Sequence, residues 1–250
     1  MPKTGLAITL PRRRFIQQAL ALAAITVIGS RWPFLARAAE ARKLKIGIIG
    51  SGRVGSTLGG AWVKAGHEVM FSSLDLEQDK ALAKSIGNGA RAGTPREAAG
   101  FGEVLLVSVP YSAMPQLGKD LGDLIKGKVI VDTSNPVPGR DGDVATKALE
   151  KGAGLASSEF LAGARIVRAF NAIGYNRLQE LSKGPGGSVG MPIAGDDAAA
   201  ISVASQLVRE AGLEPVLVGP LAMGRFLRPG TPLAGEQTPD QIRKVLPTLK

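Results

Sequence analysis

From Leu44 onward, short apolar runs alternate along the chain with longer amphipathic stretches. The apolar runs have the length of β-strands and lie at residues 44–49, 67–72, 104–109, 129–131, 165–170, 192–195 and 214–218. Apolar residues recur at helical spacing at residues 54–65, 75–85 and 197–211. Strands that alternate with helices build βαβ units around a mostly parallel sheet. The pattern therefore predicts a doubly wound, three-layer α/β fold.

Two of the apolar runs, at residues 104–109 and 129–131, lack the alternating polar residues of a half-exposed strand. Ser108 is the one polar residue in them. A strand of this kind is buried on both faces, so we expect these two to be central in the sheet. The last twenty residues are interrupted by prolines, and the pattern predicts no element there.

The N-terminal segment has a different pattern, with a cluster of positive charges followed by apolar residues. Residues 11–16 read Pro-Arg-Arg-Arg-Phe-Ile, and the apolar run at 19–29 is shorter than the roughly 20 residues that span a bilayer. This is the layout of a twin-arginine signal, and the Ala-Arg-Ala at 36–38 is a cleavage pattern. We expect a signal peptide at 1–38, export to the periplasm by the twin-arginine translocation machinery, and one domain at 39–250. A retained segment that anchors the protein to a membrane is the alternative.

Removal of residues 1–38 also changes the meaning of the net charge of +10, because that segment carries six basic and no acidic side chains. The remaining charge of about +4, without a basic run, argues against a nucleic-acid partner. The chain has no cysteine, which excludes disulfides, thiol nucleophiles and thiolate metal sites. Its one histidine, His67, stands where the second strand begins and is expected to be structural. A Ser-His-Asp triad and a histidine-rich metal site are excluded as well.

The first strand leads directly into a glycine turn, Gly-Ser-Gly-Arg-Val-Gly, that opens a predicted helix. In this context the pattern indicates a Rossmann NAD(P)-binding fold, with the pyrophosphate at the positive end of the helix. Gly50 allows the tight turn, Gly52 lets the backbone approach the pyrophosphate, and Gly55 lets helix and strand pack closely. A ligand-free strand–helix turn is the alternative. The expected cofactor-binding residues of the turn are Gly50, Ser51, Gly52, Arg53, Val54 and Gly55.

The tip of the second strand bears on the choice between NADP and NAD. NAD-specific sites usually place an acidic residue there, whereas this chain has Ser72 and Ser73. Neutral hydroxyls do not repel a 2′-phosphate, and Arg53 is expected over the adenine end of the site. NADP is therefore favoured, with NAD as the alternative. The two serines are also suited to capping the helix that follows.

The nicotinamide is expected at the carboxyl ends of the central strands, where ligands bind in doubly wound sheets. Ordinary turn chemistry is the alternative for residues of this kind. The acidic residues at 75, 77, 79, 196 and 197 look like helix starts, where carboxylates suit the helix dipole. No catalytic side chain is assigned. The residues expected near the nicotinamide are Val109, Pro110, Tyr111, Asn135, Pro136 and Asn171.

With these motifs the chain resembles the coenzyme F420-dependent NADP oxidoreductase family. The resemblance covers essentially all of the mature chain. It rests on residues 46–55, on 66–69 (Gly-His-Glu-Val), on 109–110 (Val-Pro), on 194–197 (Ala-Gly-Asp-Asp) and on 218–221 (Val-Gly-Pro-Leu) ahead of Arg225. It implies NADP as cofactor and coenzyme F420 as second substrate. In that family the second strand typically ends in Ser-Arg at the 2′-phosphate, and here the pair is Ser73 and Leu74. The resemblance also implies that Tyr111 lies near the nicotinamide.

The resulting hypothesis is an exported NAD(P)-dependent oxidoreductase that transfers a hydride between the nicotinamide and a deazaflavin, a flavin-like ring or a small organic partner. Transfer between two rings needs stacking and orientation, whereas reduction of a ketone needs a proton donor. Tyr111 or Tyr175 is a candidate donor, which leaves a carbonyl or imine reductase open. A non-catalytic dinucleotide-binding protein and a membrane-tethered reductase of metal ions or quinones stay open as well. The sequence also leaves a homodimer open.

Overall fold

The computed structural model describes Met1, residues 42–184 and residues 188–249. The expected signal peptide lies, except for Met1, outside the described residues, so that expectation stays a prediction. Residues Arg42–Lys250 form one compact unit. None of the helices described in this unit is long and apolar enough to span a membrane.

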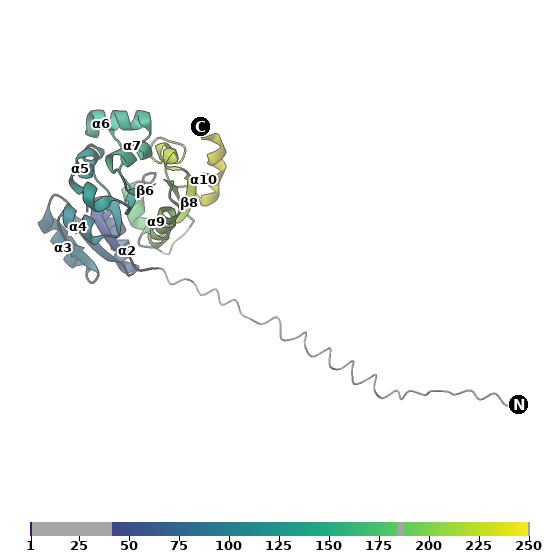
Figure 1. The fold of residues 1–250 in the computed structure, drawn as a ribbon, viewed down its shortest axis with the longest axis horizontal. Helices are drawn as coiled ribbons and strands as arrows, with labels where there is room; N and C mark the ends of the chain where they lie inside the picture. Colours follow the sequence, from purple (N-terminus) through teal and green to yellow (C-terminus); the bar gives the residue numbers. More distant parts are fainter. Residues whose placement is uncertain (2–41, 185–187, 250) are drawn as a thin grey trace. The chain divides into compact units, whose positions relative to one another are not determined.

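An eight-stranded sheet forms the centre of this unit (Figure 1), in the order β3-β2-β1-β4-β5-β6-β7-β8. The first six strands are parallel, and their order is that of dinucleotide-binding folds. β7 runs antiparallel to β6, and β8 is parallel to β7. The predicted doubly wound, mostly parallel fold is confirmed. The strands are β1 (Lys45–Ile49), β2 (Glu68–Ser72), β3 (Ala90–Ala92), β4 (Val104–Val107), β5 (Val129–Asp132), β6 (Arg165–Arg168), β7 (Gly190–Gly195) and β8 (Glu214–Gly219).

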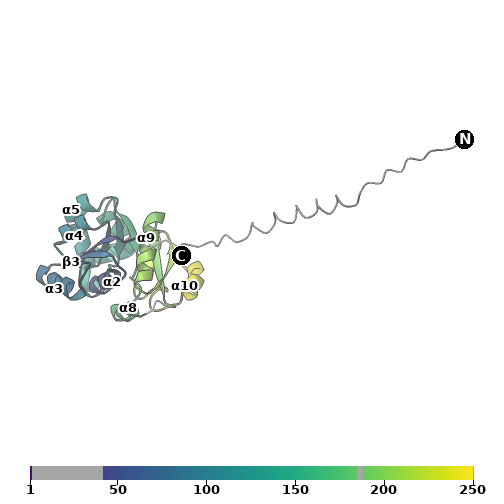
Figure 2. The same cartoon turned by 90° about the horizontal axis from the view of Figure 1, so that it is seen from below.

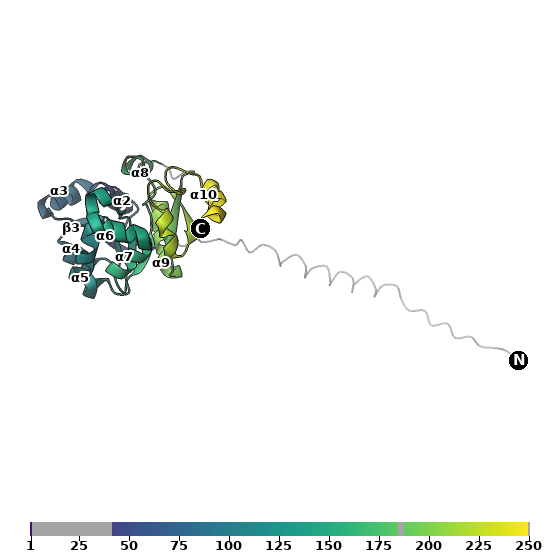
Figure 3. The ribbon, with the colours of Figure 1, turned by 90° about the horizontal axis from the view of Figure 1, so that it is seen from above.

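Helices cover both faces of the sheet. One face packs against α2 (Arg53–Lys64), α3 (Leu76–Ile86), α8 (Tyr175–Leu181) and α9 (Ala198–Glu210), with α8 beside α2 (Figure 3). The other face packs against α4 (Pro95–Phe101), α5 (Met114–Ile125), α6 (Pro138–Lys151) and α7 (Ala153–Phe160). At β7 and β8, α10 (Pro239–Val245) lies on the side opposite α9 (Figure 2). Short 3-10 helices lie at η1 (Tyr111–Ala113), η2 (Leu221–Phe226) and η3 (Leu246–Thr248).

The central strands supply both halves of the hydrophobic core. Within β4, Val104 and Leu106 face the cluster beneath α2 and α9, whereas Leu105 and Val107 face the cluster beneath α5 and α7. Successive side chains of a strand point to opposite faces, so an all-apolar strand is buried on both. The prediction that this strand and β5 are central is confirmed.

The predicted boundaries are wrong at several ends. The strands expected at 104–109 and 165–170 end at Val107 and Arg168, because the chain turns directly afterwards. The sequence pattern did not predict helices α4 to α8 and α10, because most of them are short and interrupted by glycine or proline. In the unassigned last twenty residues, α10 begins with a capping box between Thr238 and Gln241. That pairing, with proline at the first helical position, was the available signal.

Candidate functional site

The glycine turn between β1 and α2 is shaped by two glycines that the fold itself requires. Gly50 has a φ of +99°, and a Cβ there would lie 2.2 Å from the carbonyl oxygen of Ser108. A Cβ at Gly55 would lie 2.1 Å from the carbonyl oxygen of Gly50. The turn is held to the neighbouring strand because the N–H groups of Gly50 and Ser51 both donate to the Ser72 carbonyl, at 2.9 and 3.0 Å. Substitution of either glycine would therefore disturb the fold.

Gly52 has the opposite character, because a Cβ at this position would meet no atom within 4 Å. Gly52 is the N-cap of α2, with no side-chain capping bond and no acidic residue in the first turn. The first N–H groups of a helix lack intrahelical partners, and they carry the positive end of the helix dipole. This open helix end is suited to binding an anion such as a pyrophosphate.

A cavity of about 590 Å³ lies beside this turn, at the carboxyl ends of β1, β2 and β4. Leu74, Pro95, Leu117 and Leu121 contribute an apolar wall. Among the described residues that line the cavity, one is charged, namely Asp120. Such a cavity fits a flat heterocycle such as adenine. Of the sequence-predicted site residues, the cavity brings together Gly50, Gly52, Ser73, Val109 and Pro110.

The two serines at the tip of β2 have different roles in the structure. Ser72 is buried and its hydroxyl donates to the carbonyl of Ile48 at 2.6 Å, so its side chain faces the sheet and not the cavity. The Ser72 hydroxyl therefore takes part in the sheet, and the expected cofactor-binding role of this residue stays a prediction. Ser73 lines the cavity, and its hydroxyl donates to the Asp79 carboxylate at 2.8 Å.

Asp79 is a functional candidate that the sequence interpretation missed. Asp75, in the predicted acidic helix start, is the N-cap of α3 and accepts from the N–H of Gln78, so neither serine is the cap. Asp79, expected to belong to the same exposed helix start, is instead fully buried and also accepts from the hydroxyl of Ser51. It lies one turn before buried Ala83 on α3. An acidic residue on the buried stripe of a helix was the signal that would have revealed it.

Arg53 also differs from its expected position. Its guanidinium lies 4.6 Å from the ring centroid of Tyr175, the first residue of α8. Stacking of this kind is favourable between a guanidinium and an aromatic face. Arg53 therefore contacts the helix that follows β6, and its expected place over the adenine end stays a prediction.

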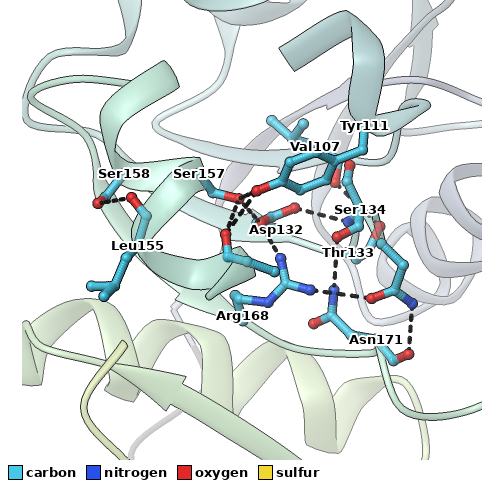
Figure 4. A network of polar contacts seen from close by, with 12 residues as sticks. Val107, Tyr111, Asp132, Thr133, Ser134, Leu155, Ser157, Ser158, Arg168 and Asn171 are labelled. Atoms are coloured by element: carbon cyan, nitrogen blue, oxygen red, sulfur yellow. Dashed lines mark hydrogen bonds and ion pairs between the residues drawn. The ribbon is translucent and has the colours of Figure 1, made fainter. Parts of the chain in front are cut away.

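A buried polar network connects the loops that follow β4, β5 and β6 (Figure 4). Asp132, at the end of β5, pairs with Arg168, at the end of β6, at 2.6 Å, and both side chains are fully buried. Asp132 also accepts from the Ser157 hydroxyl at 2.7 Å and from the Ser134 N–H at 2.8 Å. A buried carboxylate and guanidinium paired in this way hold their strands in a fixed relation, although Arg168 Nε has no hydrogen-bond partner among the described residues.

The same network places Asn135 and Asn171, which the sequence predicted near the nicotinamide. Asn135 accepts from Arg168 at 3.2 Å and donates to the Asn171 carbonyl at 2.8 Å, so its amide joins the loops after β5 and β6. Asn171 is buried, and its Oδ1 has no hydrogen-bond partner among the described residues. The residue before it, Phe170, has a φ of +65°, a strained conformation of the kind found at binding sites.

Tyr111 does not lie where the resemblance implies. The side chain is fully buried, and its hydroxyl donates to the Ala153 carbonyl at 2.8 Å and lies 3.0 Å from the Ser157 hydroxyl (Figure 4). Burial, together with the nearby charge of Asp132, raises the pKa of Tyr111 from 10.0 to about 12. A phenol buried in this way cannot donate a proton to a bound ligand, so the candidate role of Tyr111 as proton donor is corrected, whereas its expected place near the nicotinamide stays a prediction.

His67 is structural, as predicted. Its Nδ1 accepts from the Leu44 N–H at 3.0 Å, and its Nε2 lies 2.6 Å from the Glu210 carboxylate. This pairing connects the start of β2 to α9, at the opposite end of β2 from the cavity. In the described part of the chain, no group of three histidine, cysteine or acidic side chains is arranged to hold a metal ion.

Comparison with known proteins agrees with this geometry. The model of the family "NADP oxidoreductase coenzyme F420-dependent" matches residues 45–136, which include the glycine turn and the cavity. The F420-dependent NADP reductase of Methanothermobacter thermautotrophicus is 28% identical over 204 residues, which are 76% of this chain and 87% of that protein. The metalloreductase STEAP3 of Rattus norvegicus is 31% identical over 189 residues, 72% of this chain but 35% of that protein.

Among solved structures, a hypothetical protein from Sinorhizobium meliloti superposes with a TM-score of 0.66 at 22% identity, over 81% of this chain and 98% of that one. This likeness shows the fold. Taken together, the comparisons support the resemblance to the F420-dependent NADP oxidoreductases. They confirm the expected enzyme class, an NAD(P)-dependent oxidoreductase.

Proposed function

We propose that this chain is an NADP(H)-dependent oxidoreductase that transfers a hydride between the nicotinamide and a deazaflavin such as coenzyme F420. The open end of α2 at Gly52, beside an apolar cavity, is the observation that carries the proposal. The family model matches this same region, and the relative from Methanothermobacter thermautotrophicus is named for both substrates.

The chain's own residues would bind and orient the dinucleotide. The first turn of α2 binds the pyrophosphate, and the wall formed by Leu74, Leu117 and Leu121 holds the adenine. The loops after β5 and β6 would hold the nicotinamide, which would supply or accept the hydride. Those loops are fixed by the buried pair of Asp132 and Arg168. A rigid platform of this kind is what hydride transfer between stacked rings requires.

A deazaflavin is favoured over a carbonyl substrate that would take its proton from Tyr111, whereas Tyr175, which is partly exposed and stacks on Arg53, stays a candidate donor. Reduction of a carbonyl needs an acid within hydrogen-bond reach of the developing alkoxide. The Tyr111 hydroxyl is hydrogen-bonded to Ala153 and Ser157 in the core, and burial raises the pKa of Tyr111 to about 12. A partner that accepts the hydride into a conjugated ring does not require such a donor.

Reduction of a metal ion is the second candidate, favoured by the similarity to the metalloreductase STEAP3. This chain spans about a third of that relative. A bound flavin or another electron carrier would be needed between the nicotinamide and the metal, because a hydride carries two electrons and a ferric ion accepts one.

Purified protein incubated with NADPH and a panel of acceptors tests the proposal. The panel contains F420, FMN, cyclic imines, ketones and ferric chelates, and Gly52→Val serves as the binding-deficient control. We expect NADPH-dependent reduction of F420 that is lost in Gly52→Val. Turnover with a ferric chelate in the presence of flavin would favour the second candidate. Tight NADPH binding without turnover of any acceptor would favour a non-catalytic dinucleotide-binding protein.

We further propose that the protein acts outside the cytoplasm, with cleavage before Ala39. The supporting observation is the order of charges and apolar residues at 11–29. Since free NADP(H) is a cytoplasmic pool, an exported enzyme of this class has to carry its dinucleotide with it.

A further inference from the structure

The side chain of Asp79 joins the two segments that surround the adenosine ribose in a fold of this type. One of its carboxylate oxygens accepts from the hydroxyl of Ser51 in the glycine turn. The other accepts from the hydroxyl of Ser73 at the end of β2, at 2.8 Å. Asp79 is fully buried beneath both serines. In dinucleotide-binding folds the ribose hydroxyls, or the 2′-phosphate of NADP, lie between these two segments.

These bonds fix which way the Ser73 hydroxyl points. A serine hydroxyl has one hydrogen and two lone pairs. The hydrogen goes to Asp79, because a carboxylate is a stronger acceptor than the Asp75 carbonyl at 3.2 Å. One lone pair accepts from the N–H of Asp75 at 3.1 Å. Ser73 therefore presents its remaining lone pair to a ligand.

The Ser51 hydroxyl is oriented in the same way, since its hydrogen is also directed to Asp79. A free 2′-hydroxyl can donate to such lone pairs, whereas a 2′-phosphate dianion consists of acceptors and gains nothing from them. The surroundings reinforce this difference. No lysine or arginine is found among the described residues that line the cavity, and the guanidinium of Arg53 is stacked on Tyr175.

We propose that Asp79 is the positioning residue that sets coenzyme choice at the 2′ position. It turns the Ser51 and Ser73 hydroxyls into acceptors and places a negative charge beneath them. Both effects oppose a 2′-phosphate and favour a free ribose hydroxyl, so Asp79 narrows the preference for NADPH over NADH. The acidic residue that NAD sites carry at the tip of the second strand is here supplied by α3. This inference rests on the proposed function, because it requires a dinucleotide at this site.

Fluorescence titration of the whole protein with NADPH and with NADH tests the inference. In Asp79→Asn the charge is absent, and the amide can donate to one serine, whose own hydrogen is then free to point at the ligand. We expect the ratio of NADPH affinity to NADH affinity to rise about tenfold, the size of effect that one nearby charge produces when partly screened. Glu77→Gln is the matched control, because it removes one charge from an exposed position of the same helix and should leave the ratio unchanged.

Ser73→Ala gives a second readout that does not depend on a buried substitution. If Asp79 turns Ser73 into an acceptor, loss of the hydroxyl weakens the binding of NADH more than the binding of NADPH. The ratio of NADPH affinity to NADH affinity then rises severalfold. A fall of that ratio would show that Ser73 donates to the phosphate, and would overturn the inference. An unchanged ratio in both variants would overturn it too. Failure of the wild-type protein to bind either dinucleotide would instead reject the proposed function.

Discussion

Gly52 is the residue where the structure separates binding from folding most clearly. Its φ of −59° is open to any residue, and an added Cβ meets no atom within 4 Å. We therefore expect Gly52→Val to fold normally and to lose dinucleotide binding, because the side chain would occupy the place of the pyrophosphate. Fluorescence titration with NADPH, together with a thermal unfolding curve, measures the two effects separately.

Gly55→Ala is the informative comparison for that experiment. Its new Cβ would lie 2.1 Å from the Gly50 carbonyl oxygen, so we expect a loss of about 1–3 kcal/mol of stability from overpacking. NADPH affinity that stays unchanged in folded Gly52→Val would show that the pyrophosphate binds elsewhere.

Tyr111 should make the unfolding free energy depend on alkaline pH. Burial raises its pKa from 10.0 to about 12, so the folded state keeps the phenol protonated where the unfolded state releases the proton. This stabilisation is complete below pH 10.0 and is lost as the pH rises toward about 12. The free energy of unfolding then falls by about 2–3 kcal/mol in total. Urea unfolding of the wild type and of Tyr111→Phe across this range measures it. We expect a shallower alkaline decline in the variant, and equal slopes would contradict the assignment.

The residues that were correctly predicted differ in kind from those that were not. Gly50 and Gly55 were predictable because local backbone geometry requires glycine there, and Gly52 because the motif itself places it at the open N-terminus of the helix. The positions of Asp79, Ser72 and Tyr111 depend on which face of an element packs on the core. Neither a glycine motif nor the residues at the end of a strand indicate which face of an element packs on the core. The stacking of Arg53 on Tyr175 was not predictable for a related reason, since Tyr175 lies in a helix that the sequence pattern did not predict.

At the scale of elements, the ends of β5 and β6 depend on one buried ion pair. Arg168→Met would leave the Asp132 carboxylate buried without its partner, which typically costs about 3–5 kcal/mol. We expect this loss in denaturant unfolding, accompanied by weaker binding of the nicotinamide half, because Asn135 also loses its donor.

The double variant Asp132→Leu with Arg168→Met controls for the loss of packing. It removes both charges, so it should be less destabilised than the sum of the two single variants. Additive losses would show that Asp132 and Arg168 act independently of one another.

The length and apolar pattern of each element explain which parts of the fold can be predicted from the sequence. β1, β4 and β5 are continuous apolar runs, and α9 has a long amphipathic pattern, so periodicity identifies them. β3 has three residues and no buried side chain, and helices such as α4 and α8 have seven residues, too few for a periodic signal. The antiparallel pairing of β7 with β6 is a property of topology, which no local pattern encodes.

At the scale of the whole molecule, the proposed twin-arginine signal and the dinucleotide fold together lead to a prediction about the bound cofactor. The twin-arginine route carries proteins that are already folded, so the dinucleotide can be loaded before export. Because free NADP(H) is not expected outside the cytoplasm, the site has to be tight, with a dissociation constant near or below about 1 μM, or roughly −8 kcal/mol.

Expression of the full chain with Arg12→Lys and Arg13→Lys tests the export step. This variant should stay inside the cell as a folded precursor, whereas the wild type should reach the periplasm and release NADP(H) when it is denatured there. The measurements are fractionation, the mass of the exported chain and an enzymatic assay of the released nucleotide. Gly52→Val is the matched control for the cofactor, since it should be exported but empty. Wild-type periplasmic protein that is empty and binds added NADPH weakly would contradict the bound-cofactor hypothesis, because a loosely held dinucleotide could not be replaced outside the cytoplasm.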